Sequence, residues 1–335
     1  MKKLFLSVAC FIASTICFSQ IIAKTDENFL KKKEDSLKLY AVNIIQDINA
    51  EKRFKADSIF TRLFVRALKT NNSFNFAFDS LVTISKLYPP DSSFRIFTWQ
   101  LVISDNTVMQ HGAIQMKTAD GTLKLFPLID KSAIILHLAD TVVDNKSWIG
   151  AVFYRIIQTN TGKKNIYTLL GFDEDNIRSN RKIIEVLHFE NDLPVFGGNY
   201  FNFDKDSAKV PPISRYVMEY KKSAGARLTY DENLSMIVFE HLYSPSDEPK
   251  KKWTLIPDGD YEGFKWLNGQ WQHVIKVFNQ ITPEGQEPVP SPVKDAQGNT
   301  EEDKLQNNVP QNAIPADTDS VKPKTTIKKK VKPRN

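Results

Sequence analysis

The imidazole side chain changes its charge near neutral pH, so histidines are the first candidates for proton transfer and metal binding. This chain of 335 residues has five of them: His111, His137, His188, His241 and His273. No two have a metal-binding spacing such as i, i+4 on one helix. His188 shares its predicted strand face with Ile184 and Val186. The neighbours of His241 on its strand face are likewise apolar. We interpret His188 and His241 each as a core or boundary residue, and no catalytic residue is assigned.

Two acidic runs have the composition of a cation-binding loop. The run over residues 173–176 lacks the glycine and the distal glutamate of a calcium loop. In the second run, Asn202, Asp204 and Asp206 alternate as three oxygen ligands would. However, Ile213 stands where a bidentate carboxylate is expected. We interpret this run as a polar turn, and the sequence predicts neither a metal site nor a cofactor.

Motifs of known hydrolytic and phosphate-binding sites are absent from the sequence. It contains no G-x-S-x-G, no H-E-x-x-H, no S-x-x-K tied to a K-T-G, and no G-x-x-x-x-G-K loop. Its two cysteines, Cys10 and Cys17, both lie in a predicted export signal. The mature chain is therefore predicted to lack thiol catalysis and thiolate metal sites. A pair of distant carboxylates, as in a glycosidase, is not recognisable from the sequence.

Residues 1–19 have the layout of a secretory signal peptide. Two lysines form a positive n-region ahead of an uncharged, mostly apolar run over residues 4–18. Cys17 and Ser19 place small residues at positions −3 and −1 of a cleavage site before Gln20. The alternative is a membrane anchor, but the apolar run is short of the roughly twenty residues that a bilayer span needs. The residues before either cysteine do not match a lipid-attachment site. We predict export to the periplasm or to an outer-envelope-associated location.

The composition changes at residue 281, where the folded body is predicted to end. Residues 281–335 contain no aromatic residue and are rich in polar residues and proline, which predicts a disordered tail. Residues 281–321 hold eight acids and two lysines, net −6, whereas residues 322–335 hold seven basic residues and no acid, net +7. Removing the signal and the tail from the whole-chain charge of +6 leaves the body near +3. This charge gives little support for nucleic-acid binding, and none is expected.

The body is predicted to open with helices. Apolar residues recur at three- and four-residue steps over residues 37–48 and 56–68, which predicts either one long helix or a helical pair. A further short helix is predicted over residues 79–87, capped by Asp79 or Ser80 and stopped by two prolines.

After residue 91 the apolar period changes to two, which predicts strands. They cover 94–103, 107–117, 122–128, 148–158, 164–171, 182–190, 195–203, 214–220, 226–230 and 235–240. Asp120-Gly121 marks a hairpin turn, and residues 257–264 a tight turn before a closing strand. Short connections favour antiparallel neighbours. The predicted fold class is α+β, with a signal peptide (1–19), a helical segment (20–90), an antiparallel β-rich region (91–280) and a disordered tail (281–335).

Alternating aromatic residues offer two interpretations. They are Phe74, Phe76 and Phe78, followed by Phe97 and Trp99. Such residues can line a glycan-binding platform, but they more often form a core face against a helix, and we favour the core.

Three stretches, over residues 73–81, 90–99 and 257–264, resemble an uncharacterised group of exported proteins from Bacteroidota-type Gram-negative bacteria. The resemblance covers about residues 50–280. That group has no assigned activity, so the resemblance implies export and a single body and transfers no catalytic residue.

Two functions remain open at this stage. The leading hypothesis is a non-enzymatic envelope protein with a binding or structural role. The alternative is a hydrolase of envelope polymers that uses carboxylate or histidine residues from separate strands. A pocket that joins two carboxylates, or a histidine and a carboxylate, favours the alternative. A flat surface without convergent polar groups favours the leading hypothesis.

The basic block over residues 322–335 generates a prediction. We hypothesise that it tethers the protein to an anionic envelope surface, because each basic residue near such a surface contributes about 1 kcal/mol. The alternative, which we favour, is a solvated tail that only keeps the chain soluble. The mature protein should co-sediment with envelope fragments at low salt and be released at high salt, since salt screens these charges. A chain without residues 322–335 should stay in solution. Equal sedimentation of both chains at low salt would exclude the tether.

Overall fold

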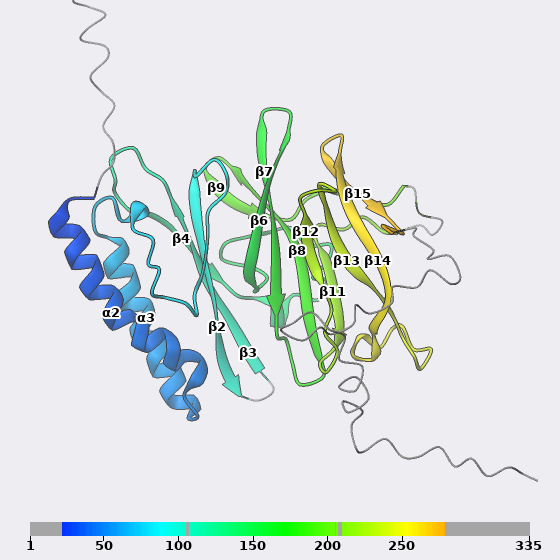
Figure 1. Cartoon of the computed structure of the whole chain (residues 1–335), viewed down its shortest axis with the longest axis horizontal. Coiled ribbons are helices and arrows are strands. Elements are labelled where there is room, and N and C mark those ends of the chain that lie inside the picture. Colours follow the sequence, from blue (N-terminus) through cyan, green and yellow to red (C-terminus); the bar gives the residue numbers. More distant parts are fainter. Residues whose placement is uncertain (1–21, 105–106, 205, 207–209, 279–335) are drawn as a thin grey trace, which may run out of the picture. The chain divides into compact units, whose positions relative to one another are not determined.

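The computed structural model describes residues 22–278 apart from 105–106, 205 and 207–209. The predicted signal peptide and the predicted disordered tail, with its basic block at 322–335, lie outside the described residues. Two helices come first and strands follow them along the chain (Figure 1). Within the described part of the chain, neither helix is long and apolar enough to cross a membrane.

The helical region is a pair, α2 (Lys24–Gln46) and α3 (Ala50–Leu68). Asn49 separates them because its side chain accepts a hydrogen bond from the Lys52 N–H at 3.2 Å and caps α3. Arg53 holds the turn in place by donating to the carbonyl oxygens of Asp47 at 2.7 Å and of Val102 at 2.6 Å. The turn is thereby joined to the first sheet, which resolves the choice between one helix and two.

The helix predicted over residues 79–87 is wrong. The segment forms turns and then β1 (Ser85–Leu87), which pairs with the following strand. The N–H groups of Leu81 and Ile84 donate to the carbonyl oxygens of Phe78 and Leu81, so successive turns advance by three residues. The side chains of Phe78, Leu81 and Ile84 are all buried. Buried apolar residues at steps of three resemble the pattern of an amphipathic helix. The N–H of Ser80, a predicted cap, donates instead to the Glu34 carboxylate on α2 at 2.7 Å.

Three sheets follow the helices. The first has the order β1-β2-β3-β4, with β2 (Phe94–Ser104), β3 (Thr107–Met116) and β4 (Lys124–Ile129). The second has the order β5-β9-β8-β7-β6, with β5 (Val143–Asp144), β6 (Val152–Thr161), β7 (Lys164–Asp173), β8 (Ser179–Glu190) and β9 (Leu193–Phe196), and β11 (Tyr216–Lys221) also pairs with β8. The third has the order β10-β15-β14-β13-β12, with β10 (Phe201–Asn202), β12 (Leu228–Asp231), β13 (Met236–Tyr243), β14 (Ile256–Leu267) and β15 (Gln270–Val274).

Every pairing of these strands is antiparallel except that of β10 with β15, so the α+β class with mostly antiparallel sheets is confirmed. Short 3₁₀ turns occur at η1 (Ser73–Asn75), η2 (Ser132–Ile134) and η3 (Lys252–Thr254). The predicted strand over 195–203 is divided into β9 and β10. The predicted tight turn over 257–264 is wrong, because these residues lie within β14. Gly263 permits this close pairing, since a Cβ there would lie 2.6 Å from the Ile237 carbonyl oxygen.

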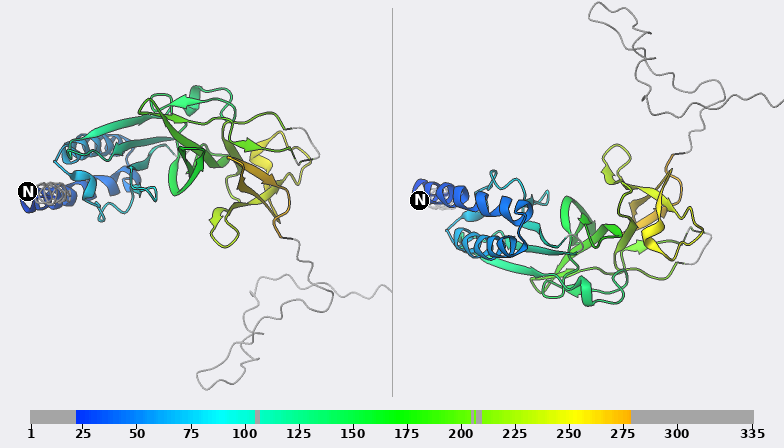
Figure 2. Two further views of the ribbon diagram at one scale, coloured as in Figure 1. Left: turned by 90° about the horizontal axis from the view of Figure 1, so that it is seen from above. Right: turned by 90° about the horizontal axis from the view of Figure 1, so that it is seen from below.

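The core consists of three clusters between four layers. The helices cover one face of the first sheet, as two further views show (Figure 2). Phe97 and Trp99 on β2 face the helices, which confirms their interpretation as core residues. The other face of β2, with Phe94 and Ile96, packs on the second sheet. The second and third sheets enclose the last cluster, which contains Trp271.

A buried ion pair lies within the second sheet. The Arg215 Nε donates to the Glu185 carboxylate at 2.7 Å, and both side chains are at most 1% exposed. The rest of the guanidinium donates to the carbonyl oxygens of Leu138, Thr141 and Phe196. Burial raises the pKa of Glu185, and the charge of Arg215 opposes that rise. The pair therefore joins β8, β9, β11 and the loop before β5.

The ion pair generates a stability prediction. Arg215→Met should lower the free energy of unfolding by about 3–5 kcal/mol, because it leaves the Glu185 charge buried without compensation. The double replacement Arg215→Met with Glu185→Met should recover part of this loss. Urea unfolding followed by circular dichroism measures both.

Arg155→Met is the matched control. Arg155 and Glu232 form an ion pair in which the side chains are 45% and 69% exposed. Its loss should cost less than about 1 kcal/mol. Equal effects of the buried and the exposed replacements would contradict the structural role of Arg215.

Candidate functional site

Four of the five histidines contact a carboxylate. The pairs are His111 with Asp57, His188 with Glu190, His241 with Asp258, and His273 with Asp206. His188 is buried, in line with its apolar strand neighbours, whereas a bulge after Glu240 leaves the His241 side chain 42% exposed. The fifth, His137, is exposed. The His111 and His273 pairs line cavities that also contain apolar side chains.

The larger of these two cavities is a groove between α3 and the first sheet, which we call the α3 groove. Its volume is about 440 Å³. Its lining comprises Asp57, Ser58, Thr61 and Arg62 from α3, Trp99 from β2, Met109, Gln110, His111 and Gly112 from β3, and Pro127, Leu128, Ile129 and Asp130 at β4. Its size and composition are typical of small-molecule sites, which are mainly apolar with a few convergent polar groups.

Strand pairing positions the polar centre of the groove. Trp99 and His111 are direct partners in the antiparallel ladder of β2 and β3, so their side chains stand together on the face that α3 covers. Their rings meet edge to face with centroids 5.7 Å apart. Asp57 on α3 completes the group, because its Oδ1 accepts from the Trp99 Nε1–H at 2.9 Å and contacts the His111 Nδ1 at 3.0 Å.

This arrangement determines which His111 nitrogen faces the groove. An ionised carboxylate only accepts hydrogen bonds, so the proton belongs on Nδ1, beside Asp57. Among the described residues, Nε2 of His111 has no hydrogen-bond partner. The Thr61 hydroxyl is buried and also has no partner among them. The groove thus contains one imidazole nitrogen without a partner within largely apolar walls.

The walls of the groove are held by a second carboxylate. Asp130 accepts hydrogen bonds from the N–H groups of Gln110 at 3.0 Å, Ser132 at 2.9 Å and Gly150 at 3.3 Å. These bonds fix the end of β4 against β3. Met109 and Ile129 form the rim and are 40% and 43% exposed. A ligand that covered them would remove apolar surface from water.

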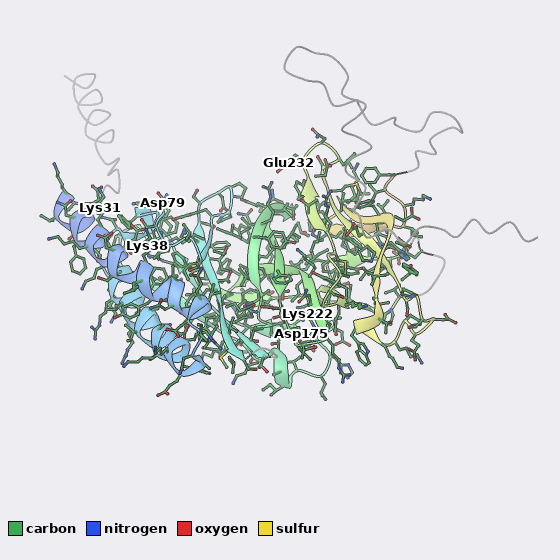
Figure 3. The ribbon with its side chains drawn as sticks, turned by 60° about the horizontal axis from the view of Figure 1, so that its bottom comes forward. Lys31, Lys38, Asp79, Asp175, Lys222 and Glu232 are labelled. Atoms are coloured by element: carbon green, nitrogen blue, oxygen red, sulfur yellow. The ribbon has the colours of Figure 1, made fainter. Side chains whose placement is uncertain are left out.

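The acidic run over residues 173–176 lies at another place. The Arg181 guanidinium contacts the carboxylates of Asp175 at 2.7 Å, Glu219 at 3.2 Å and Asp173 at 3.8 Å. Asp175 and Lys222 line a polar cavity of about 300 Å³ and lie near each other in Figure 3. Burial raises the pKa of Asp173 to about 6. The carboxylates of Asp173, Asp175 and Glu219 therefore already contact a basic side chain.

The second acidic run does not converge either. The Asn202 side chain accepts from the Asp204 N–H at 2.8 Å, whereas Asp206 contacts His273 at 2.8 Å. In the described part of the chain, no three His, Cys, Asp or Glu residues are grouped so that they could hold a metal ion.

The α3 groove was missed at the sequence level, although part of it was within reach. The predicted strands 94–103 and 107–117 have a short connection centred near residue 105, and antiparallel pairing about that point places Trp99 opposite His111. Asp57 carries no such signal, because it precedes His111 by 54 residues and its contact depends on the docking of α3.

Comparison with protein-family models, with curated proteins and with solved structures finds no match. The interpretation of the groove therefore depends on its own geometry.

Asp173 generates a prediction about pH. Because its pKa in the folded protein, about 6, exceeds the usual 3.8, its protonated form favours folding. That contribution is fully present below pH 3.8 and is lost as the pH rises through about 6. Asp173→Asn should therefore stabilise the protein by about 1–3 kcal/mol at neutral pH and have little effect near pH 4. Chemical unfolding of both chains at several pH values measures the difference.

Asp173 accepts hydrogen bonds from the Gln110 side chain at 2.9 Å and from the Asp175 N–H at 3.1 Å. The amide oxygen of asparagine can accept both of them. If the difference in the free energy of unfolding between the two chains is independent of pH, or is largest in acid, then ionisation of Asp173 does not destabilise the folded protein.

Proposed function

We propose that this is an exported envelope protein that binds a ligand with an apolar body and a hydrogen-bonding group in the α3 groove. The single observation that supports binding is the convergence of Asp57, Trp99 and His111 inside a mainly apolar cavity of about 440 Å³. The predicted signal peptide supports export. The periplasm or the outer envelope is the proposed location.

The groove divides the recognition of such a ligand into two parts. Contact with Met109, Leu128 and Ile129 would contribute about 25 cal/mol for each Å² of apolar surface removed from water. The His111 Nε2 would orient the polar end, because it lacks a partner among the described residues.

A second candidate is hydrolysis of an envelope polymer. The observation that favours it is the pairing of a histidine with a carboxylate in a pocket, the feature by which the two functions were distinguished above. Asp57 orients His111 so that Nε2 is directed away from the carboxylate, as a general base requires. Water would serve as the nucleophile, since no described hydroxyl donates to His111.

Binding is tested with N-phenyl-1-naphthylamine, a neutral apolar dye whose fluorescence rises in an apolar site. The mature chain should bind it, and Met109→Glu should weaken binding by about tenfold or more, because it places a charge at the apolar rim. Val82→Glu is the matched control, since Val82 is a 78% exposed apolar residue outside the groove lining. Equal dye binding by all three chains would overturn the assignment of the groove.

His111→Gln separates the two functions. If the groove only binds, neither the mature chain nor this variant cleaves a polymer. If it hydrolyses, the mature chain should release soluble products from peptidoglycan fragments, detected by mass spectrometry. His111→Gln should then reduce the rate about 10²–10⁴-fold, as the loss of a general base does.

A further inference from the structure

A row of alternating carboxylates and imidazoles crosses the third sheet, and we call it the acid–base row. It runs from Asp206 to His273 (2.8 Å), from His273 to Glu262 (3.4 Å), from Glu262 to His241 (3.8 Å) and from His241 to Asp258 (2.6 Å). Glu262 is therefore shared by two histidines. The row is separate from the α3 groove, which belongs to α3 and the first sheet.

The pairing of three strands brings these groups together. His273 on β15 is the direct partner of Phe264 on β14, and Glu262 precedes Phe264 by two residues on the same strand face. His241 lies on β13, where the register shifts between Glu240 and Leu242. This bulge directs the His241 side chain towards β14, where it contacts Glu262 and Asp258.

The end of the row formed by Asp206, His273 and Glu262 lines a cavity of about 310 Å³. Its lining comprises Ala139, Phe203, Asp206, Val210, Ile213, Arg215, Tyr216, Val217, Glu262 and His273. Arg215 does not make the cavity positive, because its charge is paired with Glu185 at 2.7 Å. The remaining polar groups belong to the acid–base row and to Tyr216, and the rest of the wall is apolar or aromatic.

Two polar atoms of this wall are buried without a partner. The Nε2 of His273 and the Oδ1 of Asp206 accept or donate no hydrogen bond among the described residues. His273 as a whole is only 7% exposed. Glu262 lies 3.4 Å from the His273 Nε2, but the geometry is not that of a hydrogen bond. Buried polar atoms are normally satisfied, and the Asp206 Oδ1 is an acceptor, so it calls for a hydrogen-bond donor.

The charge of the row indicates what that partner is. Three carboxylates face two imidazoles, so a negative charge remains even when both imidazoles are protonated. Burial lowers the pKa of His273, but contacts with Glu262 and Asp206 outweigh burial and raise that pKa above its usual value. An anion would therefore meet Asp206 and Glu262 unfavourably, whereas a cation would complete the charge balance.

The aromatic side chains favour the same kind of ligand. Phe203 and Tyr216 both line the cavity, and the faces of aromatic rings attract ammonium groups. We propose that this cavity is a second binding site, which takes the ammonium group of a small amine between Asp206, Glu262 and the rings of Phe203 and Tyr216. The cavity volume limits the ligand to a small molecule or to the amine end of a larger one.

Three probes of similar length and different charge test the proposal. They are 1,4-diaminobutane (cationic), 1,4-butanediol (neutral) and succinate (anionic), titrated into the mature chain by isothermal calorimetry. The diamine should bind, and the affinity of the diol should be lower by about tenfold or more. Succinate should not bind. Equal affinity for diamine and diol, or binding of succinate, would overturn the assignment to an amine.

Variants locate the binding event. Asp206→Asn and Glu262→Gln should each weaken diamine binding by about tenfold, because each removes one charge-assisted contact. Glu232→Gln is the matched control, because Glu232 is exposed between β12 and β13, outside the cavity lining (Figure 3). If Glu262→Gln lowers the melting temperature, this variant is left out. Diamine binding by Asp206→Asn, on the loop after β10, is then compared with that of Glu232→Gln.

An independent readout is the NMR signal of the His273 imidazole in the mature chain. The diamine should shift it in the wild type and in Glu232→Gln, and much less in Asp206→Asn. Diamine binding that is unchanged in both cavity variants and leaves the His273 signal in place would show that the amine binds elsewhere on the chain.

Discussion

The structure depends most on the buried ion pair of Glu185 and Arg215. Removing two charges from water is costly, and only a complete set of partners makes such a pair tolerable. Arg215 has that set, since it contacts the Glu185 carboxylate and three carbonyl oxygens from the loop before β5 and from β9. Because these partners come from separate segments, the pair forms only when β8, β9, β11 and the loop are correctly assembled. It therefore specifies the second sheet, against which the other two sheets pack.

A second buried cation acts similarly between the helices and the first sheet. Arg95 on β2 donates to the Gln115 side chain at 2.9 Å and to the carbonyl oxygens of Phe76 at 2.6 Å and Ser73 at 2.8 Å. Burial lowers the pKa of Arg95. Its charge rests against the ring of Phe97 at 4.7 Å. Arg95 thus fastens the irregular segment after α3, where the predicted helix over 79–87 does not form.

The two cavities lie beside these assembled layers and differ in chemistry. The α3 groove has apolar walls around one oriented imidazole, so it suits a ligand with an apolar body. The cavity at the acid–base row has excess negative charge and an unsatisfied buried carboxylate oxygen, so it suits a cation. Arg215 lines the second cavity, and its pairing with Glu185 is what allows the carboxylates of the row to determine the local charge. The same ion pair therefore serves both assembly and the proposed amine site.

The sequence by itself determined the periodic features of this protein. The helical stripe, the change to period two near residue 91 and the short connections predicted α+β structure with mostly antiparallel sheets, because periodicity records which face of each element is buried. It failed where a prediction depended on local capping, stopping and turn residues. Asp79 and Ser80 precede turns and β1 instead of a helix, and Gly259 and Gly263 resemble turn residues but lie within β14.

Only the tertiary structure decided which distant side chains meet. Trp99 faces His111 through local pairing, but Asp57 joins them because α3 docks on the sheet. Asp206 and His273 are 67 residues apart, and Arg215 and Glu185 are 30 apart. Their contacts follow from strand order and from the stacking of layers, which a pattern along one segment does not contain. The physical reason is that burial is encoded locally in the chain, whereas charge pairing and cavity shape arise between segments that the sequence lists separately.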